Sequence, residues 1–174
     1  FSGNCHAVAE LTAYAHSRGV TVEGELGHVG ANDSCSEGEG QDDYSLYTEP
    51  EDARRFAEST GVDALAVSIG TAHGTYKSKP RLDLERLAAI ASLVEAPLVL
   101  HGGSGLSDED FRRAIQNGIA KVNIFTDINT AQAKAAYDAY VPGTGMTELM
   151  PEMSRAVKQA TLEKMRLFGC AGRG

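Results

Sequence analysis

PLVLHGGSG, residues 97–105, is the stretch that decides the fold of this chain. A short apolar run ends on His101, which leads directly into a glycine-rich turn. Apolar and β-branched residues bounded by turn residues are typical of a buried strand. His101 is therefore predicted at the carboxyl end of a strand, where α/β folds place their chemistry. The turn offers backbone N–H groups and the Ser104 hydroxyl ahead of a helix beginning near Ser107, as in a phosphate-binding loop.

The same arrangement occurs one unit earlier in the chain. ALAVSI, residues 64–69, predicts a strand, and GTAHG, residues 70–74, places His73 just beyond its carboxyl end. Two imidazoles at the ends of neighbouring strands suit Zn²⁺ or a related metal. Either histidine considered alone is better explained by a structural role. The matching contexts of the pair favour a metal site.

The remaining chain alternates between helical and extended patterns. The predicted helices span residues 7–17, 48–60, 82–93, 107–117 and 147–168, and one more begins at Thr126–Asp127. The predicted strands span residues 20–26, 64–69, 97–101 and 119–125. No two strands lie close enough for a hairpin, so the sheet should be parallel. Four strand–helix repeats make half of an eight-stranded barrel or a small doubly wound sheet.

Several helix ends and one loop carry further signals. Thr48 is a plausible N-cap, with Pro50 and Glu51 in the first turn that follows. Residues 107–110, SDED, predict a capped helix start. Residues 27–48 form a long loop rich in Gly, Asp, Glu and Ser, of the kind that serves as a lid or is disordered.

Polar side chains recur on the predicted strands. Alternation over residues 20–26 places Glu23 and Glu25 on one face. Two carboxylates facing one way are costly unless they meet a cation or hydrogen-bond donors, and a solvated edge strand is the alternative. Asn123 lies near the end of the last strand, followed by Thr126 at a helix start. Considered alone, Asn123 is explained as a turn residue and Thr126 as an N-cap. If both lie beside the Ser104 turn, they would complete an anion-binding site.

Composition limits the classes of function. The 174 residues suffice for one domain with a sizeable core, and a net charge of -8 argues against non-specific nucleic-acid binding. Three scattered cysteines without CxxC spacing indicate reduced thiols in a cytosolic protein. No long apolar span predicts export or membrane insertion. The chain begins with Phe1 and enters a helical pattern almost at once, so we expect that it has been cut from something longer.

Four segments together resemble a known family. They are VEGELGHVGAND, SIGTAHGTYK, LVLHGGSGLSDEDFRRAIQNGIAKVNIFTD and KMRLFGCAGRG. These segments resemble class II, metal-dependent ketose-bisphosphate aldolases, in the fructose- and tagatose-bisphosphate group. The resemblance covers nearly the whole chain and implies a (β/α)₈ TIM barrel. Residues 1–174 would be the carboxyl-terminal half, about strands five to eight, with residues 27–48 as a mobile active-site loop and residues 147–174 as a terminal helix and tail.

The resemblance also implies roles for individual residues. His73 and His101 match two of the three histidines that hold the family's zinc, and a monovalent cation is a second expected ion. The third histidine and the catalytic aspartate belong to an earlier strand that this chain lacks. Glu25 matches a carboxylate near the metal, and Asp33, a shorter acid, stands where the mobile loop usually carries glutamate. The substrate-binding positions implied are Gly74, Gly102, Gly103, Ser104, Asn123, Ile124, Phe125 and Thr126.

The implied reaction is the reversible cleavage of fructose or tagatose 1,6-bisphosphate to dihydroxyacetone phosphate and glyceraldehyde 3-phosphate. The implied partners are these phosphorylated substrates and further copies of the chain, as a dimer or tetramer in the cytoplasm, with no nucleic acid and no membrane. Two alternatives remain. One is a catalytically silent phosphosugar-binding or assembly module that lacks the first barrel half. The other is a different phosphosugar enzyme of barrel fold, such as an isomerase or epimerase.

Overall fold

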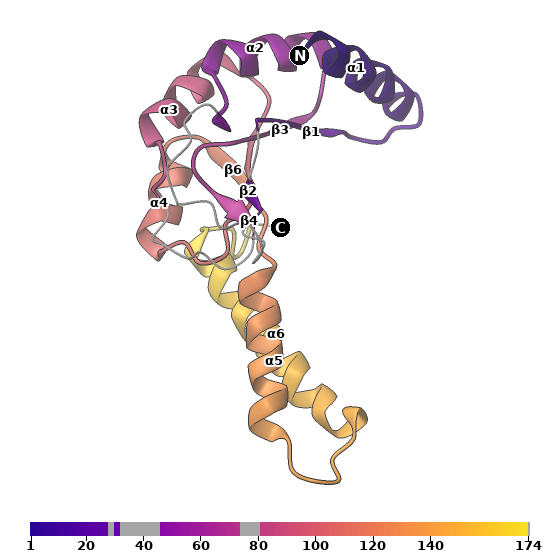
Figure 1. Ribbon diagram of the computed structural model, residues 1–174, viewed down its shortest axis with the longest axis vertical. Helices are drawn as coiled ribbons and strands as arrows, with labels where there is room; N and C mark the ends of the chain where they lie inside the picture. Colours follow the sequence, from indigo (N-terminus) through magenta and orange to yellow (C-terminus); the bar gives the residue numbers. More distant parts are fainter. Residues whose placement is uncertain (28–29, 32–45, 74–80, 174) are drawn as a thin grey trace.

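A computed structural model describes residues 1–27, 30–31, 46–73 and 81–173, with the backbone alone described for residues 30–31 and 72–73 (Figure 1). The helices are α1 (Ser2–His16), α2 (Pro50–Thr60), α3 (Leu84–Leu93), α4 (Asp108–Gln116), α5 (Thr126–Ala139) and α6 (Met146–Leu167). The strands are β1 (Glu23–Leu26), β2 (Gly30–Ala31), β3 (Ala64–Val67), β4 (Ala72–His73), β5 (Leu98–Leu100) and β6 (Ile119–Val122). The alternation of strands and helices expected from the sequence is confirmed.

The main sheet has four strands in the order β1-β3-β5-β6, all parallel. Ala66 pairs with Val99, and Val99 pairs with Lys121 after a register shift between β5 and β6. The short strands β2 and β4 form a separate parallel pair in which Ala31 lies opposite His73. The predicted parallel sheet is therefore confirmed, and its carboxyl-terminal edge collects the residues that follow each strand.

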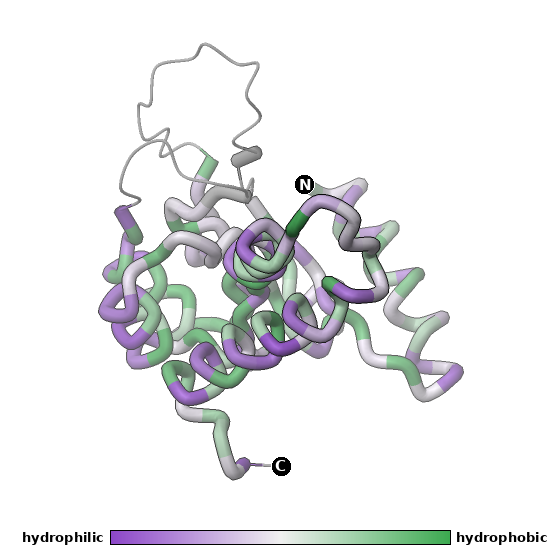
Figure 2. The backbone as a smooth tube through the Cα atoms, turned by 90° about the horizontal axis from the view of Figure 1, so that it is seen from below, coloured by the Kyte–Doolittle hydropathy of each residue, from purple (hydrophilic) through white to green (hydrophobic). Residues whose placement is uncertain are grey.

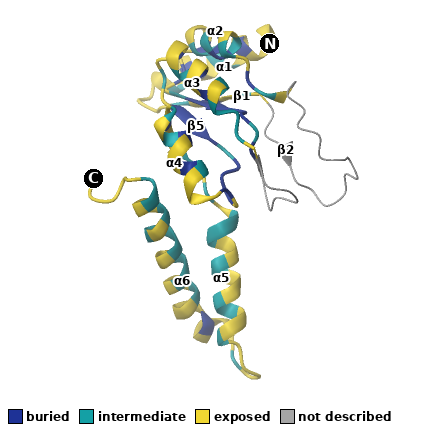
Figure 3. Cartoon of the chain, turned by 90° about the vertical axis from the view of Figure 1, so that its left-hand side faces the viewer, coloured by how far each residue is buried: buried dark blue, intermediate teal, exposed yellow. Residues whose placement is uncertain are grey.

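Helices α1 to α4 form an arc along one side of the sheet (Figure 1). Leu65 and Val67 of β3 and Leu98 and Leu100 of β5 are buried against them. Figure 3 shows the buried residues concentrated in the strands and on the inner sides of these helices. Hydrophilic and hydrophobic residues occur together within the turns of the helices, as in amphipathic helices (Figure 2). The opposite face of the sheet has no helix against it among the described residues.

Gly24 explains why β1 can lie close to its helix. A Cβ atom at this position would lie 3.0 Å from both Phe56 and Val62. Gly24 is buried between two residues that are exposed, Glu23 and Glu25. The strand therefore turns its backbone toward the helices and both carboxylates to the other face.

Thr48 does not cap α2 as predicted. The helix begins at Pro50 with Glu49 as the N-cap residue, which makes no side-chain capping bond. The buried Thr48 hydroxyl instead donates to the Leu26 carbonyl at 2.5 Å and accepts from the Ser68 N–H at 2.8 Å. The prediction failed because the hydroxyl finds better partners at the carboxyl ends of two strands than in the adjacent helix. One of these strands, β1, precedes Thr48 in the sequence and the other, β3, follows it. By contrast, the capping box at Ser107 and Asp110 is confirmed.

Helices α5 and α6 extend away from the sheet as a hairpin (Figure 1). Helix α5 buries no residue and α6 buries only Leu149, in line with the intermediate and exposed colouring of Figure 3. The hairpin is attached at its base to Phe111 of α4. The ring of Phe168 lies tilted against the Phe111 ring with the two centroids 5.0 Å apart, and Nζ of Lys164 lies 4.9 Å from the centroid of the same ring. None of the helices in the described part of the chain has the length and apolar character to cross a membrane.

Candidate active site

His101 occupies the position that the sequence predicts, directly after β5 at the carboxyl edge of the sheet. Its side chain is 15% exposed, and its two ring nitrogens contact different carboxylates. Nδ1 lies 2.6 Å from Oε2 of Glu25, and Nε2 lies 3.0 Å from Oε1 of Glu23. Both glutamates of β1 therefore contact the same imidazole. This agrees with the expectation that two carboxylates on one face of a strand need a cation or hydrogen-bond donors nearby.

A neutral imidazole carries one N–H group and one lone pair. It can therefore donate to only one of these two carboxylates, and the other nitrogen then has the lone pair that a metal ion would bind. Imidazole nitrogen and carboxylate oxygen are ligand types that zinc takes, in groups of three or four. Within the described residues, no group of three or more His, Cys, Asp or Glu side chains is arranged to hold a metal. The role of His101 as a metal ligand therefore stays a prediction.

Lys121 belongs to this cluster, although the sequence reasoning missed it. Its Nζ donates to Oε2 of Glu23 at 2.7 Å and to Oδ1 of Asn123 at 2.9 Å. Burial acts to raise the pKa of the Glu23 carboxyl, but the hydrogen bonds and charges of Lys121 and His101 together hold that pKa below its ordinary value. Period-two alternation with Asn123 was the available signal that Lys121 faces the same side.

The glycine-rich turn after His101 lies against the amino end of α5. Gly102 has φ of 66°, a conformation that favours glycine, and a Cβ at Gly103 would lie 3.2 Å from both Phe111 and Val122. The Ser104 hydroxyl, 5% exposed, accepts from the backbone N–H groups of Phe125 and Asp127 at 3.3 and 3.4 Å. The predicted meeting of this turn with the start of α5 is therefore present.

The other predicted substrate-binding residues near α5 have different surroundings. The Asn123 N–H donates to the Leu100 carbonyl at 3.0 Å, which joins β6 to β5. Ile124 packs against the hydrophobic core, whereas Phe125 is 74% exposed. Phe125 is the N-cap residue and Thr126 is the first residue of the helix, so the alternative reading of Thr126 as an N-cap is wrong.

Some predicted residues lie outside what the structure describes. These are Asp33 and Gly74, together with the side chain of His73, and the same holds for most of the predicted loop at residues 27–48. The backbone of His73 is described, and it ends β4 beside Ala31. The roles expected for these residues stay predictions.

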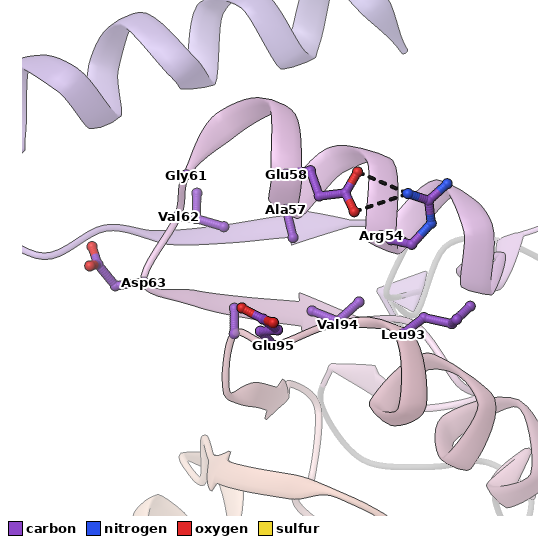
Figure 4. Close-up of a pocket in the computed structure, with 10 residues that line it drawn as sticks. Arg54, Ala57, Glu58, Gly61, Val62, Asp63, Leu93, Val94 and Glu95 are labelled. Atoms are coloured by element: carbon purple, nitrogen blue, oxygen red, sulfur yellow. Dashed lines mark hydrogen bonds and ion pairs between the residues drawn. The ribbon is translucent and has the colours of Figure 1, made fainter.

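A pocket of about 530 Å³ lies at the opposite edge of the sheet (Figure 4). It is formed by the connections that lead into β3 and β5, including Val62, Asp63 and Glu95, and by Arg54 and Glu58 of α2. Arg54 is already paired with Glu58 at 2.9 Å. Because the strands are parallel, this pocket is separated from His101 by the length of the sheet and contains none of the site residues that the sequence predicts.

Comparison with known proteins shows the family to which this chain belongs. Residues 1–173 match the family described as Fructose-bisphosphate aldolase class-II. The chain is 42% identical over 173 residues to the uncharacterized protein YdjI of Escherichia coli K12, covering 99% of this chain and 60% of that protein. The crystal structure of the YdjI aldolase superposes with a TM-score of 0.83 at 38% identity, covering 99% of this chain and 58% of that one.

A second solved structure gives the same result. The putative fructose-1,6-bisphosphate aldolase of Coccidioides immitis has a TM-score of 0.83 and 29% identity, covering 99% of this chain and 60% of that one. The chain therefore spans about three-fifths of the length of the relatives that it matches. Its four parallel strands and their helices correspond to part of a TIM barrel, and the chain belongs to the class II fructose-bisphosphate aldolase family.

Proposed function

We propose that the complete protein catalyses the reversible, zinc-dependent aldol cleavage of a ketose 1,6-bisphosphate, either fructose or tagatose, to dihydroxyacetone phosphate and glyceraldehyde 3-phosphate. The observation that supports it best is the position of His101, held between two carboxylates beside the Ser104 turn in a chain of this family. In this proposal residues 1–174 form the second half of a barrel, residues 27–48 cover the site, and residues 147–174 form a terminal helix and tail. We also propose a cytoplasmic dimer or tetramer.

His73 and His101 would hold the zinc. When bound, zinc supplies Lewis-acid polarisation of the ketose carbonyl. Glu25, through its contact with the imidazole of His101, would fix the orientation of the ring and raise the basicity of the liganding nitrogen. Asp33 would carry a proton at the substrate carbon, a general acid–base role worth about 10²–10⁴ in rate.

The phosphate of the substrate would lie on the Ser104 turn. Gly102 and Gly103, both buried, add no side chain of their own to this turn, and Gly74 would contribute from the neighbouring strand end. Residues 123–126 would complete this site, and the amino terminus of α5 would add N–H groups and the positive end of the helix dipole. Ser104 now accepts from two of the N–H groups of α5, so an arriving phosphate oxygen would compete with the hydroxyl for them.

The test is a cleavage assay on the complete purified protein with fructose and tagatose 1,6-bisphosphate, in which dihydroxyacetone phosphate is measured by its enzymatic reduction. We expect cleavage of at least one substrate, loss of cleavage after chelation and recovery with zinc. Binding of dihydroxyacetone phosphate without cleavage would replace the proposal with the silent binding module. Interconversion of sugar phosphates without carbon–carbon cleavage would replace it with an isomerase or epimerase.

A further inference from the structure

We infer that Lys121 is a positioning residue of the proposed site, which fixes the side-chain amide of Asn123 so that its NH₂ group faces the substrate. This inference rests on the proposed function for the identity of the substrate, but the orientation itself rests on the contacts of Lys121. The contact of Lys121 with Glu23 joins β6 to β1, the two outermost strands of the sheet.

The chemistry of the two groups decides how the amide lies. An ammonium group has three donors and no acceptor, whereas an amide has an oxygen that accepts and an NH₂ that donates. Lys121 can therefore contact only the oxygen of Asn123, and the observed distance of 2.9 Å joins Nζ to Oδ1. Because the two ends of an amide point apart, the NH₂ group is directed away from Lys121. It can then serve only an acceptor, such as a carbonyl, hydroxyl or phosphate oxygen.

Glu23 keeps the ammonium group in place. Its Oε2 accepts from Lys121 at 2.7 Å, while its Oε1 contacts His101. Lys121 thus has a carboxylate anchor on the far strand and an amide target on its own strand. The long lysine side chain alone would sample many rotamers, and the anchor reduces them to those that reach Asn123.

A purely structural role would give a different result. The Lys121 side chain is 52% exposed, and exposed ion pairs contribute little to stability. Loss of the ammonium should lower the melting temperature by less than about 4 °C. A large loss of substrate binding without a large loss of stability would therefore reflect the orientation of the amide.

The experiment uses the complete protein with Lys121→Met, Lys121→Arg and Asn123→Ala, and with the double variant Lys121→Met/Asn123→Ala. The matched control is Lys134→Met, which removes an exposed lysine from its pair with Asp138 on α5. The readouts are the Kd for dihydroxyacetone phosphate, the zinc content, and the ¹H–¹⁵N resonances of the Asn123 side-chain amide in metal-free protein.

We expect Lys121→Met to weaken binding about 10-fold, the value of one lost hydrogen bond, with unchanged zinc content. Lys121→Arg should recover part of the loss. The double variant should bind no more weakly than Asn123→Ala alone, because Lys121 acts through Asn123. The Asn123 amide resonances should shift in Lys121→Met and not in Lys134→Met.

Additive losses in the double variant, or amide resonances that do not move, would overturn the inference. If the unaltered protein binds no ketose phosphate while the resonances still shift, the orientation stands and the proposed function fails. The two results can therefore be told apart.

Discussion

His101 meets a carboxylate at each ring nitrogen, which a neutral ring can satisfy on one side only. Glu23 and Glu25 supply negative charge around the ring, and Lys121 balances part of it. The cluster therefore brings two carboxylates, an imidazole and an ammonium group together at one edge of the sheet.

Replacement of His101 tests the ligand assignment. We expect His101→Ala to weaken zinc binding by more than about 100-fold, because changes of outer residues around a metal alone cost about 10–100-fold. The measurement is the zinc content and affinity of the complete protein. His6→Ala is the control, because His6 is exposed on α1 and contacts only Glu10 among the described partners. Unchanged zinc stoichiometry in His101→Ala would refute the assignment.

Asp63 provides a pH-dependent contact on the opposite edge. It accepts from His16 at 2.8 Å and from the Val22 N–H at 2.7 Å, and these bonds, with that from His16 first, lower the pKa of its carboxyl. A lowered pKa means that the folded state prefers the ionised form. The stability from this carboxylate is therefore present above its unfolded pKa of about 3.9 and is lost as the pH falls through the lower folded value.

We expect Asp63→Asn to lower the melting temperature at pH 7 and to approach the unaltered protein as the pH falls through the lowered folded pKa of Asp63, below which neither protein carries a charge at this position. Thermal unfolding followed across this pH range measures the difference. Asp138→Asn, which removes an exposed carboxylate on α5, is the control. A difference that stays constant with pH would show that the charge of Asp63 does not contribute.

Thr48 joins two strands through one hydroxyl. Because it is 2% exposed, its two hydrogen bonds to β1 and to the residue after β3 are protected from water. Thr48→Val keeps the shape and leaves the Leu26 carbonyl and the Ser68 N–H without this partner. We expect a loss of about 1–3 kcal/mol in the free energy of unfolding.

Denaturant unfolding of the two proteins measures this loss. The control is Thr130→Val, because Thr130 is exposed on α5 and the same change of side chain there should be near neutral. Equal stability of Thr48→Val and the unaltered protein would show that other groups replace the hydroxyl.

Sequence patterns predicted the structure well where residues that are close together in the sequence decide it. The capping box at Ser107 and the alternation of Glu23, Gly24 and Glu25 needed only short spacings. Thr48 was assigned to the wrong partner because its hydroxyl bonds to strands distant in sequence. Lys121 was missed because its contact with Glu23 spans 98 residues and exists only once the sheet curves. The predicted strand over residues 20–26 was too long, since pairing with β3 begins at Glu23.

The molecule as a whole combines a packed sheet layer with a thinly attached hairpin. The core includes Phe56, Leu87 and Phe111 under the sheet, whereas α5 buries no residue. Exposed apolar side chains lie along the hairpin and its tip. They include Tyr137, Tyr140, Val141, Met146 and Met150.

Hydrogen exchange should separate these two parts. We expect backbone amides of β3 and β5 to exchange at the slowest rates and those of α5 and α6 to exchange much faster, because few buried contacts hold the hairpin. Mass spectrometry of peptides from each region measures the rates. Protection of the hairpin equal to that of β3 would contradict this and would show that the hairpin is covered in solution.

The bond from Lys121 to Glu23 has a mechanical consequence. It links the two outermost strands of the sheet, on the face that has no helix against it among the described residues. This bond adds a restraint on the bend of the sheet from within this chain. A polypeptide that paired with either outer strand would therefore meet an edge that is already curved.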